Sequence, residues 1–258
     1  MELTIAVVSR LGGRERNEDS CGYRDEGGPV CCVLSDGAGG HGGGDVASKV
    51  AVGSVLDEFA QGPECSSERV ASLIEGANRD VIATQSRAER LNDMRATLVV
   101  LAFDPARGLV VWGHVGDSRL YMLRNGYVIA RTKDHSLYQS MVDAGFASPE
   151  GASTAKLSVL IASLGSDDGF EPETLGEPVR LQPGDAFLLC SDGFWEHNND
   201  AAIEASLQRA ASPEDWLEQL SRRVADANKP AQDNYSAIAV WCGAMDFTTR
   251  RLTRDRIG

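Results

Sequence analysis

Apolar residues along this chain fall into short runs, some alternating with polar residues and others continuous, and both patterns are typical of β-strands. Four such runs predict strands in the outer parts of the chain, at Leu3–Ser9, Val30–Leu34, Ala186–Cys190 and Ser236–Trp241. Four more follow one another closely in the middle, at Ala96–Phe103, Leu109–Val115, Arg119–Leu123 and Tyr127–Arg131. The dipeptide Asn125-Gly126 between the last two predicts a two-residue hairpin.

Other apolar residues recur with helical spacing. The predicted helices cover Gly43–Phe59, Ser67–Ser86 with Ser67 as the N-cap, Ser136–Ala144, Asp200–Ala210 and Pro213–Ala227. The polar stretch Phe146–Lys156 is expected to be mobile. Clustered strands with pairs of helices between and after them favour a layered α+β fold over a regular βαβ alternation.

Length and segment composition indicate one domain. A chain of 258 residues can bury one substantial core. No repeat, low-complexity tract or Pro/Ser-rich linker divides it, and the Arg-bearing tail after Gly243 is expected to fray. No apolar run approaches the length of a membrane span and no signal-peptide core follows Met1, so we expect a cytoplasmic protein without a membrane partner.

Charge and cysteine usage exclude some classes of function. The formal net charge of −13 disfavours a polyanionic partner such as nucleic acid. None of the six cysteines forms a Cys-x-x-Cys pair, and most lie in apolar, strand-like runs. Buried, reduced cysteines are therefore expected rather than disulfides or a zinc site.

Aspartates recur where apolar runs stop. Asp36 and Asp192 each follow a serine, precede a glycine and end a predicted buried strand. Asp117 and Asp233 lie next to the ends of other predicted strands. A single Asp-Gly pair is common in turns, but strand ends in a layered sheet fold can converge on one edge, where loops build sites. The repeated Ser-Asp-Gly context favours such a shared site.

Carboxylates that converge repel one another, so a site of this kind needs cations. Glu18 and Asp19, which precede another possible strand, add two more acids. Hard oxygen ligands without a set of histidines or cysteines indicate Mg²⁺ or Mn²⁺ rather than zinc. The sequence therefore predicts a hard-metal site built from acids at strand ends.

Six short motifs extend this pattern along the chain. They are Arg14-Glu-Arg-Asn17-Glu18-Asp19, Asp36-Gly37-Ala-Gly-Gly-His41, Gly116-Asp117-Ser118-Arg119, Lys133-Asp134-His135-Ser136, Ser191-Asp192-Gly193-Phe194-Trp195 and Asp233-Asn234. In this order and spacing they resemble the metal-dependent protein phosphatases, the type 2C serine/threonine phosphatases, and among these the bacterial branch. Each motif alone is weak, but six in order over Leu3 to Trp241 are specific.

The resemblance implies a fold and a reaction. The fold is α+β, a central antiparallel β-sandwich flanked by helices on both faces in a four-layer αββα arrangement, with residues 1–243 forming one phosphatase domain and 244–258 a short tail. The reaction is hydrolysis of a phosphomonoester by a water or hydroxide that bridges two Mn²⁺ or Mg²⁺ ions. Such a pair of ions can neutralise the phosphate and orient an in-line attack.

The resemblance also implies roles for individual residues. The direct metal ligands are Asp36, which bridges the ions, the Gly37 carbonyl, Asp192 and Asp233. Glu18 and Asp19 would bind metal-coordinated waters, and Asp117 matches a ligand for a third, weaker ion in bacterial members. Arg14 matches the arginine that grips the substrate phosphate, to which it offers a planar bidentate fork.

The proton donor for the leaving group is not assigned by these motifs. Many eukaryotic members have a histidine directly after the Asp-Gly pair, and here this position is Ala38. His41 lies further along the glycine loop and is interpreted as a loop residue.

The expected substrates are phosphorylated Ser/Thr proteins, the expected partner is an opposing Ser/Thr kinase or its substrates, and a monomer is expected. A non-catalytic, phosphoprotein-binding pseudophosphatase is one alternative, although every implied metal ligand is present. A phosphatase of small metabolites is another. The third is a dinucleotide-binding oxidoreductase, because Gly37, Gly39 and Gly42 satisfy a Gly-x-Gly-x-x-Gly fingerprint after a predicted strand, with Asp57 about 20 residues later.

Overall fold

Two antiparallel sheets form the centre of the molecule. The computed structural model describes residues 1–38, 42–148, 159–166, 170–227 and 231–245. One sheet has five strands in the order β1-β12-β11-β7-β8, and these are β1 Leu3–Arg10, β12 Tyr235–Cys242, β11 Ala186–Cys190, β7 Arg119–Arg124 and β8 Tyr127–Arg131. The first and last strands of the chain pair along their whole length, from Leu3↔Cys242 to Arg10↔Tyr235.

The second sheet has seven strands. Five follow the order β10-β6-β5-β3-β2, and these are β10 Val179–Arg180, β6 Leu109–Val115, β5 Leu98–Asp104, β3 Val30–Ala38 and β2 Asp19–Arg24. The short strands β4 Arg95–Ala96 and β9 Glu173–Thr174 pair with β3 and β6 respectively. All of these pairings are antiparallel.

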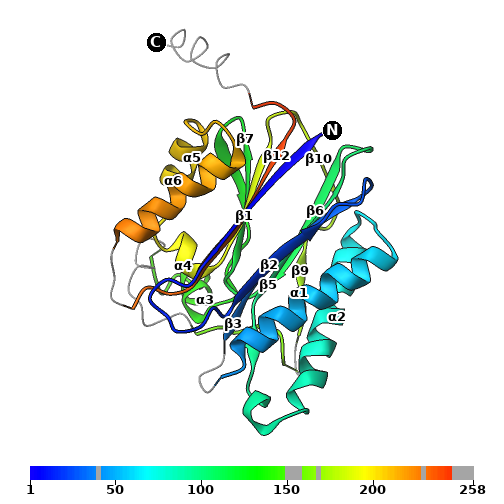
Figure 1. Ribbon diagram of the computed structural model, residues 1–258, viewed down its shortest axis with the longest axis vertical. Helices are drawn as coiled ribbons and strands as arrows, with labels where there is room; N and C mark the ends of the chain where they lie inside the picture. The colour runs from blue at the N-terminus through cyan, green and yellow to red at the C-terminus, as the bar shows by residue number, and fades with distance from the viewer. Residues whose placement is uncertain (39–41, 149–158, 167–169, 228–230, 246–258) are drawn as a thin grey trace.

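Helices cover the outer face of each sheet (Figure 1). On the seven-stranded sheet lie α1 Gly44–Gln61 and α2 Ser67–Gln85, and on the five-stranded sheet lie α5 Asp200–Leu207 and α6 Pro213–Asp226. Shorter helices are η1 Glu89–Leu91, α3 Leu137–Asp143 and α4 Asp192–Trp195. The predicted four-layer αββα sandwich is therefore confirmed.

Alternation along β3 shows why its sequence is continuously apolar. Cys31 and Val33 pack under α1 and α2, whereas Cys32 and Leu34 face the other sheet. Successive side chains of a strand point to opposite faces, so a strand covered on both sides is apolar at every position. The cysteines are free, and all except the half-buried Cys21 are buried, as expected.

Sequence signals for turns and helix caps predicted the bounds of most helices and strands to within a few residues. The Asn125-Gly126 hairpin joins β7 to β8, and both residues have positive φ, 61° and 76°, as a two-residue turn of this kind requires. The N-cap of α2 is Ser66 rather than the predicted Ser67, since the Ser66 side chain accepts a hydrogen bond from the Arg69 amide. The short strands β9 and β10 have too few residues to produce a detectable pattern.

The dinucleotide-binding alternative is contradicted by this topology. A Rossmann unit needs a parallel strand reached through a helical crossover, but β3 pairs antiparallel with both of its neighbours, β2 and β5. Two other predictions, the mobility of 149–156 and the fraying of the tail after residue 245, lie outside the described residues, as does His41. Among the helices described, none is both long and apolar enough to cross a membrane.

Candidate active site

One cavity collects most of the predicted site residues. It has a volume of about 210 Å³ and opens where residues of both sheets meet. Seven of its lining residues were singled out from the sequence as ligands or phosphate contacts: Arg14, Glu18, Asp36, Gly37, Asp117, Asp192 and Asp233. Its other lining residues are Ala38, Thr97, Leu160 and Asn234. Asp19, the eighth predicted residue, does not line the cavity but is buried directly behind it.

Asp36 occupies an interior position of its strand, which corrects the prediction that the strand ends before it. The strand β3 continues to Ala38, and Asp36 is held by backbone contacts with a threonine. Its amide donates to Thr97 Oγ1 at 3.0 Å, and its carbonyl accepts from the Thr97 amide at 2.8 Å. These bonds fix the backbone, so the carboxylate projects from a rigid element.

The glycines after Asp36 and Asp192 are required by close backbone approach. A Cβ on Gly37 would lie 2.0 Å from the Gly44 carbonyl oxygen, and one on Gly193 would lie 2.2 Å from the Asn234 carbonyl oxygen. Both distances are far below any van der Waals contact. The repeated Ser-Asp-Gly sequence therefore reflects two places where the chain next to an acid must pass against another segment.

Serine hydroxyls connect Asp19 of one sheet to the other sheet. Ser191 Oγ, at the end of β11, donates to Asp19 Oδ2 at 2.9 Å and accepts from the Ser236 amide at 3.0 Å. The second carboxylate oxygen, Asp19 Oδ1, is buried and has no hydrogen-bond partner among the described residues. A buried acceptor without a partner is rare, so this oxygen is available to a ligand of the site.

Asn234 holds the loop that carries Arg14. Its side-chain amide donates to the carbonyls of Leu11 and Arg16 at 2.8 and 2.9 Å, and its Oδ1 accepts from the Glu18 amide at 2.8 Å. Arg14 Nη2 lies 2.7 Å from Asp233 Oδ2, and both side chains are about half exposed. The guanidinium is thus placed at the solvent side of the cavity, next to one of the acids.

The electrostatics of the cavity are those of crowded acids. Burial, followed by the charges of Asp192 and Asp19, raises the pKa of Asp36 well above its usual value. Burial, followed by Asp117 and Asp233, raises the pKa of Asp192 to about 8. Burial is also the main cause that raises the pKa of Asp19 and of Asp117 to about 6 and that raises the pKa of Glu18.

These shifts predict that the metal-free protein loses stability as the pH rises from 5 to 8.5. A carboxyl group in the unfolded chain titrates near pH ~4, whereas Asp19, Asp117 and Asp192 keep their protons to about pH 6, 6 and 8 when folded. The folded state binds more protons in this window, so the free energy of unfolding falls with pH. Thermal unfolding in EDTA, followed by circular dichroism, measures this.

The variant Asp192→Asn isolates the contribution of the acids. Burial lowers the pKa of His114, so this histidine acts in the opposite direction and favours the folded state at higher pH. The difference in melting temperature between wild type and Asp192→Asn should therefore widen as the pH rises. Saturating Mn²⁺ should reverse the pH-dependent fall in the melting temperature of the wild-type protein. A difference that stays constant from pH 5 to 8.5 would contradict the crowded-acid interpretation.

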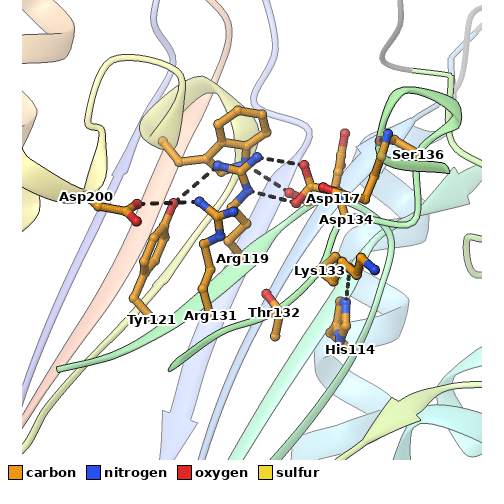
Figure 2. A network of polar contacts seen from close by, with 12 residues as sticks. His114, Asp117, Arg119, Tyr121, Arg131, Thr132, Lys133, Asp134, Ser136 and Asp200 are labelled. Carbon is orange, nitrogen blue, oxygen red and sulfur yellow. Dashed lines mark hydrogen bonds and ion pairs between the residues drawn. The ribbon is translucent and has the colours of Figure 1, made fainter. Parts of the chain in front are cut away.

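A largely buried arginine, Arg119, pairs with Asp134 beside Asp117 (Figure 2). Arg119 donates from Nε and Nη2 to the two carboxylate oxygens of Asp134 at 2.8 and 2.7 Å. Its guanidinium carbon lies 3.4 Å from the centroid of the Trp195 ring, and Trp195 Nε1 donates to the Asp117 carbonyl at 2.9 Å. The position of Asp117 therefore depends on residues of β7, of α4 and of the segment after β8.

A second group of titratable residues lies outside the cavity. Potential ligand atoms of His114, His135 and Glu173 fall within 4.8 Å of one another. His114 Nε2 lies 2.7 Å from the Lys133 carbonyl and must donate to it, and His135 Nδ1 accepts from the Gly116 amide at 3.3 Å. His135 Nε2, 3.2 Å from Glu173, then carries the proton. These separate hydrogen bonds fasten Lys133 and His135, which precede α3, to β6, to Gly116 and to β9.

The sequence did not indicate that Thr97 and Leu160 line the cavity, nor that Asn234 holds the Arg14 loop in place. Thr97 and Leu160 belong to apolar stretches and carry no charge, so no local signal marked them. Asn234 was part of a motif, but its three hydrogen bonds to the Arg14 loop became visible only in the structure. Ala38 lines the cavity as expected from its position after Gly37, and its methyl group cannot donate a proton.

Comparison with known proteins agrees with this geometry. Residues 8–236 match the family model of protein phosphatase 2C. The serine/threonine protein phosphatase PstP of Mycobacterium tuberculosis is 36% identical over 200 residues, which are 76% of this chain and 37% of PstP. The chain therefore spans little more than a third of that relative.

Two further comparisons cover most of the related protein. The serine/threonine phosphatase stp of Listeria monocytogenes is 33% identical over 202 residues, 76% of this chain and 79% of stp. The crystal structure of the catalytic domain of PstP in complex with 2 manganese ions matches with a TM-score of 0.79 at 26% identity, over 94% of this chain and 99% of that one. The chain belongs to the protein phosphatase 2C family.

Proposed function

We propose that this protein is a metal-dependent phosphatase that removes phosphate from phosphoserine and phosphothreonine in proteins. The observation that carries the proposal is the convergence of Asp36, Asp192 and Asp233, which are far apart in the sequence, on one cavity that Arg14 also lines. The relatives PstP and stp are named serine/threonine phosphatases, and the family match covers residues 8–236.

The donor set of the cavity fits two or three Mn²⁺ or Mg²⁺ ions. Asp36, Asp192, Asp233 and the Gly37 carbonyl would be direct ligands, with Asp36 shared between two ions, and Asp117 would hold a third. All of these donors are oxygens, which hard cations prefer. Burial and neighbouring acids raise the pKa values of Asp36 and Asp192, which supports the proposal because bound cations would stabilise the charged carboxylates. The unpartnered Asp19 Oδ1 suits a water bound to a metal, as does the nearby Glu18.

The protein's own contribution is to bind and orient. When bound, the ions would supply an activated water and neutralise charge on the phosphate. Arg14 would hold the phosphate oxygens with its planar fork. Arg14 is about half exposed, so its guanidinium can reach a substrate, and its partner Asp233 is one of the residues that would hold a metal. Thr97 would keep Asp36 in place throughout, because their contacts involve the Asp36 backbone.

The biological setting is part of the same proposal. The substrates would be phosphorylated Ser/Thr proteins. The partners would be an opposing Ser/Thr kinase or its targets, and the protein would act in the cytoplasm. We further infer a monomer whose phosphatase domain comprises residues 1–243. The pairing of β1 with β12 supports this boundary, since the sheet needs both of these strands, and the family match falls inside it.

Hydrolysis of a phosphothreonine peptide tests the function. We expect phosphate release in Mn²⁺ and a return to background after EDTA, because the attacking water and the charge neutralisation both depend on the ions. A phosphotyrosine peptide and a sugar phosphate serve as comparison substrates and should be hydrolysed more slowly. Binding of Mn²⁺ without any phosphate release would indicate a pseudophosphatase, and faster hydrolysis of the sugar phosphate would indicate a metabolite phosphatase. Either result would contradict the proposal.

A further inference from the structure

Arg95 lies on the same face of the sheet edge as the metal-site acid Asp36. The two-residue strand β4 pairs antiparallel with the end of β3, with Ala38 opposite Arg95. Side chains of directly opposed residues lie on the same face of the sheet, and residues two apart on one strand share a face as well. Asp36 and Ala38 therefore share one face of β3, and Arg95 lies beside Ala38 on the same face.

A second cavity adjoins the first at Ala38 and Leu160. It has a volume of about 400 Å³, and Ala38 and Leu160 line both cavities. Its remaining lining residues are Arg95, Ile161, Ala162, Ser163 and Ser166. Arg95 is the one charged side chain among these described lining residues. A ligand in the first cavity therefore lies next to a second cavity that is lined by small and apolar residues and a single positive charge.

The guanidinium of Arg95 has donors to spare. Nη1 donates to the Met94 carbonyl at 3.1 Å, and within the part of the chain that the structure describes no carboxylate pairs with Arg95. A guanidinium has five N–H donors. The stem of the side chain passes close to Gly165, since Arg95 Cδ lies 3.1 Å from the place where a Cβ on Gly165 would be. The head is thus held near the cavity without an acidic partner.

We propose that Arg95 binds an acidic side chain that flanks the phosphorylated residue of the substrate. This inference rests on the proposed phosphatase function and adds a preference to it. Ala38 is two residues beyond Asp36, a displacement of about 7 Å along a strand. An extended peptide with its phosphate at the acids would therefore bring a residue about two or three positions away to Arg95. On a protein of net charge −13, acidic residues elsewhere on the substrate would be repelled.

Matched phosphothreonine peptides test this preference. In each pair, one peptide carries Glu and the other Gln at a single position between −3 and +3, and kcat/KM is measured in Mn²⁺ at low salt. We expect the Glu peptide to be favoured about fivefold at one position, the size expected of a partly exposed ion pair. The gain should appear in KM, because the contact lies away from the reacting phosphate and stabilises the ground state and the transition state equally.

Variants at Arg95 assign the preference to this residue. Arg95→Gln should reduce the Glu/Gln ratio to about one, Arg95→Lys should keep part of it, and Arg95→Glu should favour a Lys peptide over the Glu peptide at the same position. Arg90→Gln, which removes an exposed positive charge five residues away, should keep the wild-type ratio. Because each ratio is taken within one variant, differences in folded fraction cancel.

Two results would overturn the inference, and they separate it from the proposed function. A wild-type ratio of one at all positions, or a ratio that survives in Arg95→Gln, contradicts the role of Arg95 while leaving the phosphatase activity in place. If no phosphothreonine peptide releases phosphate in Mn²⁺, both the function and the preference built on it are wrong.

Discussion

The variant Asp36→Asn should lose about a thousandfold or more in kcat, since changing even the outer partners of metal ligands typically costs 10–100-fold. Asp36 would bridge the two central ions, and a neutral amide neither bridges them nor balances their charge. At the same time the metal-free protein should not become less stable. The change removes a carboxyl group whose charged form is opposed by burial and by Asp192 and Asp19.

This pairing of a large loss in activity with no loss in stability is specific to a functional acid. The side chains of Asp and Asn have nearly the same shape, and the hydrogen bonds of Asp36 to Thr97 involve its backbone. Catalytic rates in saturating Mn²⁺, melting temperatures in EDTA and calorimetric Mn²⁺ titrations together check the prediction. Asp57→Asn is the matched control, because Asp57 is 80% exposed on α1 and should show none of these effects.

Two outcomes would contradict the assignment of Asp36. If Asp36→Asn keeps more than a tenth of the wild-type rate in saturating Mn²⁺, the residue does not bridge essential ions. If its melting temperature in EDTA drops by several degrees, the carboxylate stabilises the fold, and a loss of activity would reflect unfolding.

The variant Arg119→Met should destabilise the protein by about 3–5 kcal/mol, the usual cost of breaking a buried ion pair from one side. Arg119 and Asp134 are each only 12% exposed and are joined by two hydrogen bonds. Removal of the guanidinium leaves the Asp134 carboxylate without its partner in a poorly hydrated place. It also removes the group stacked on Trp195. Urea unfolding of the metal-free protein measures the change.

A double-mutant cycle separates the loss of the pair from the exposure of an unpaired acid. The second change, Asp134→Asn, should restore part of the stability of Arg119→Met, because the buried charge is then gone. Arg222→Met is the control, since Arg222 and Glu218 pair on the surface with side chains 69% and 60% exposed, and exposed pairs contribute about 1 kcal/mol or less. A cost of the same small size at Arg119 would contradict the prediction.

Arg119→Met should also weaken metal binding at Asp117 more than at the central site. Burial is the largest cause that raises the pKa of Asp117, the charge of Asp134 raises this pKa further, and the charge of Arg119 lowers it. Without the arginine, Asp117 holds its proton more strongly and Trp195 is less firmly placed. Asp36, Asp192 and Asp233 do not contact Arg119 through any hydrogen bond of the described residues, so tight binding of two ions should persist in calorimetry.

Periodicity and short-range chemistry made the fold predictable. Continuous apolar runs identified the strands because both faces of each sheet are covered, and Asn125-Gly126 identified the hairpin because its positive φ angles suit those residues. The short strands could not be found in this way. The strand β4, which brings Arg95 next to Ala38, has only two residues and is formed by pairing with β3 rather than by its own propensity.

The sequence by itself determined which acids could make a metal site, because each stands at or near a strand that its apolar pattern predicts, and Asp36 and Asp192 share the context Ser-Asp-Gly. It could not determine how those acids are held. Ser191 reaches Asp19 across 172 residues, Trp195 reaches Asp117 across 78, and Arg14 reaches Asp233 across 219. Only the tertiary structure decides such contacts, because they depend on which distant strands pair and on how the two sheets pack, and a local pattern of residues carries no information about distance between segments.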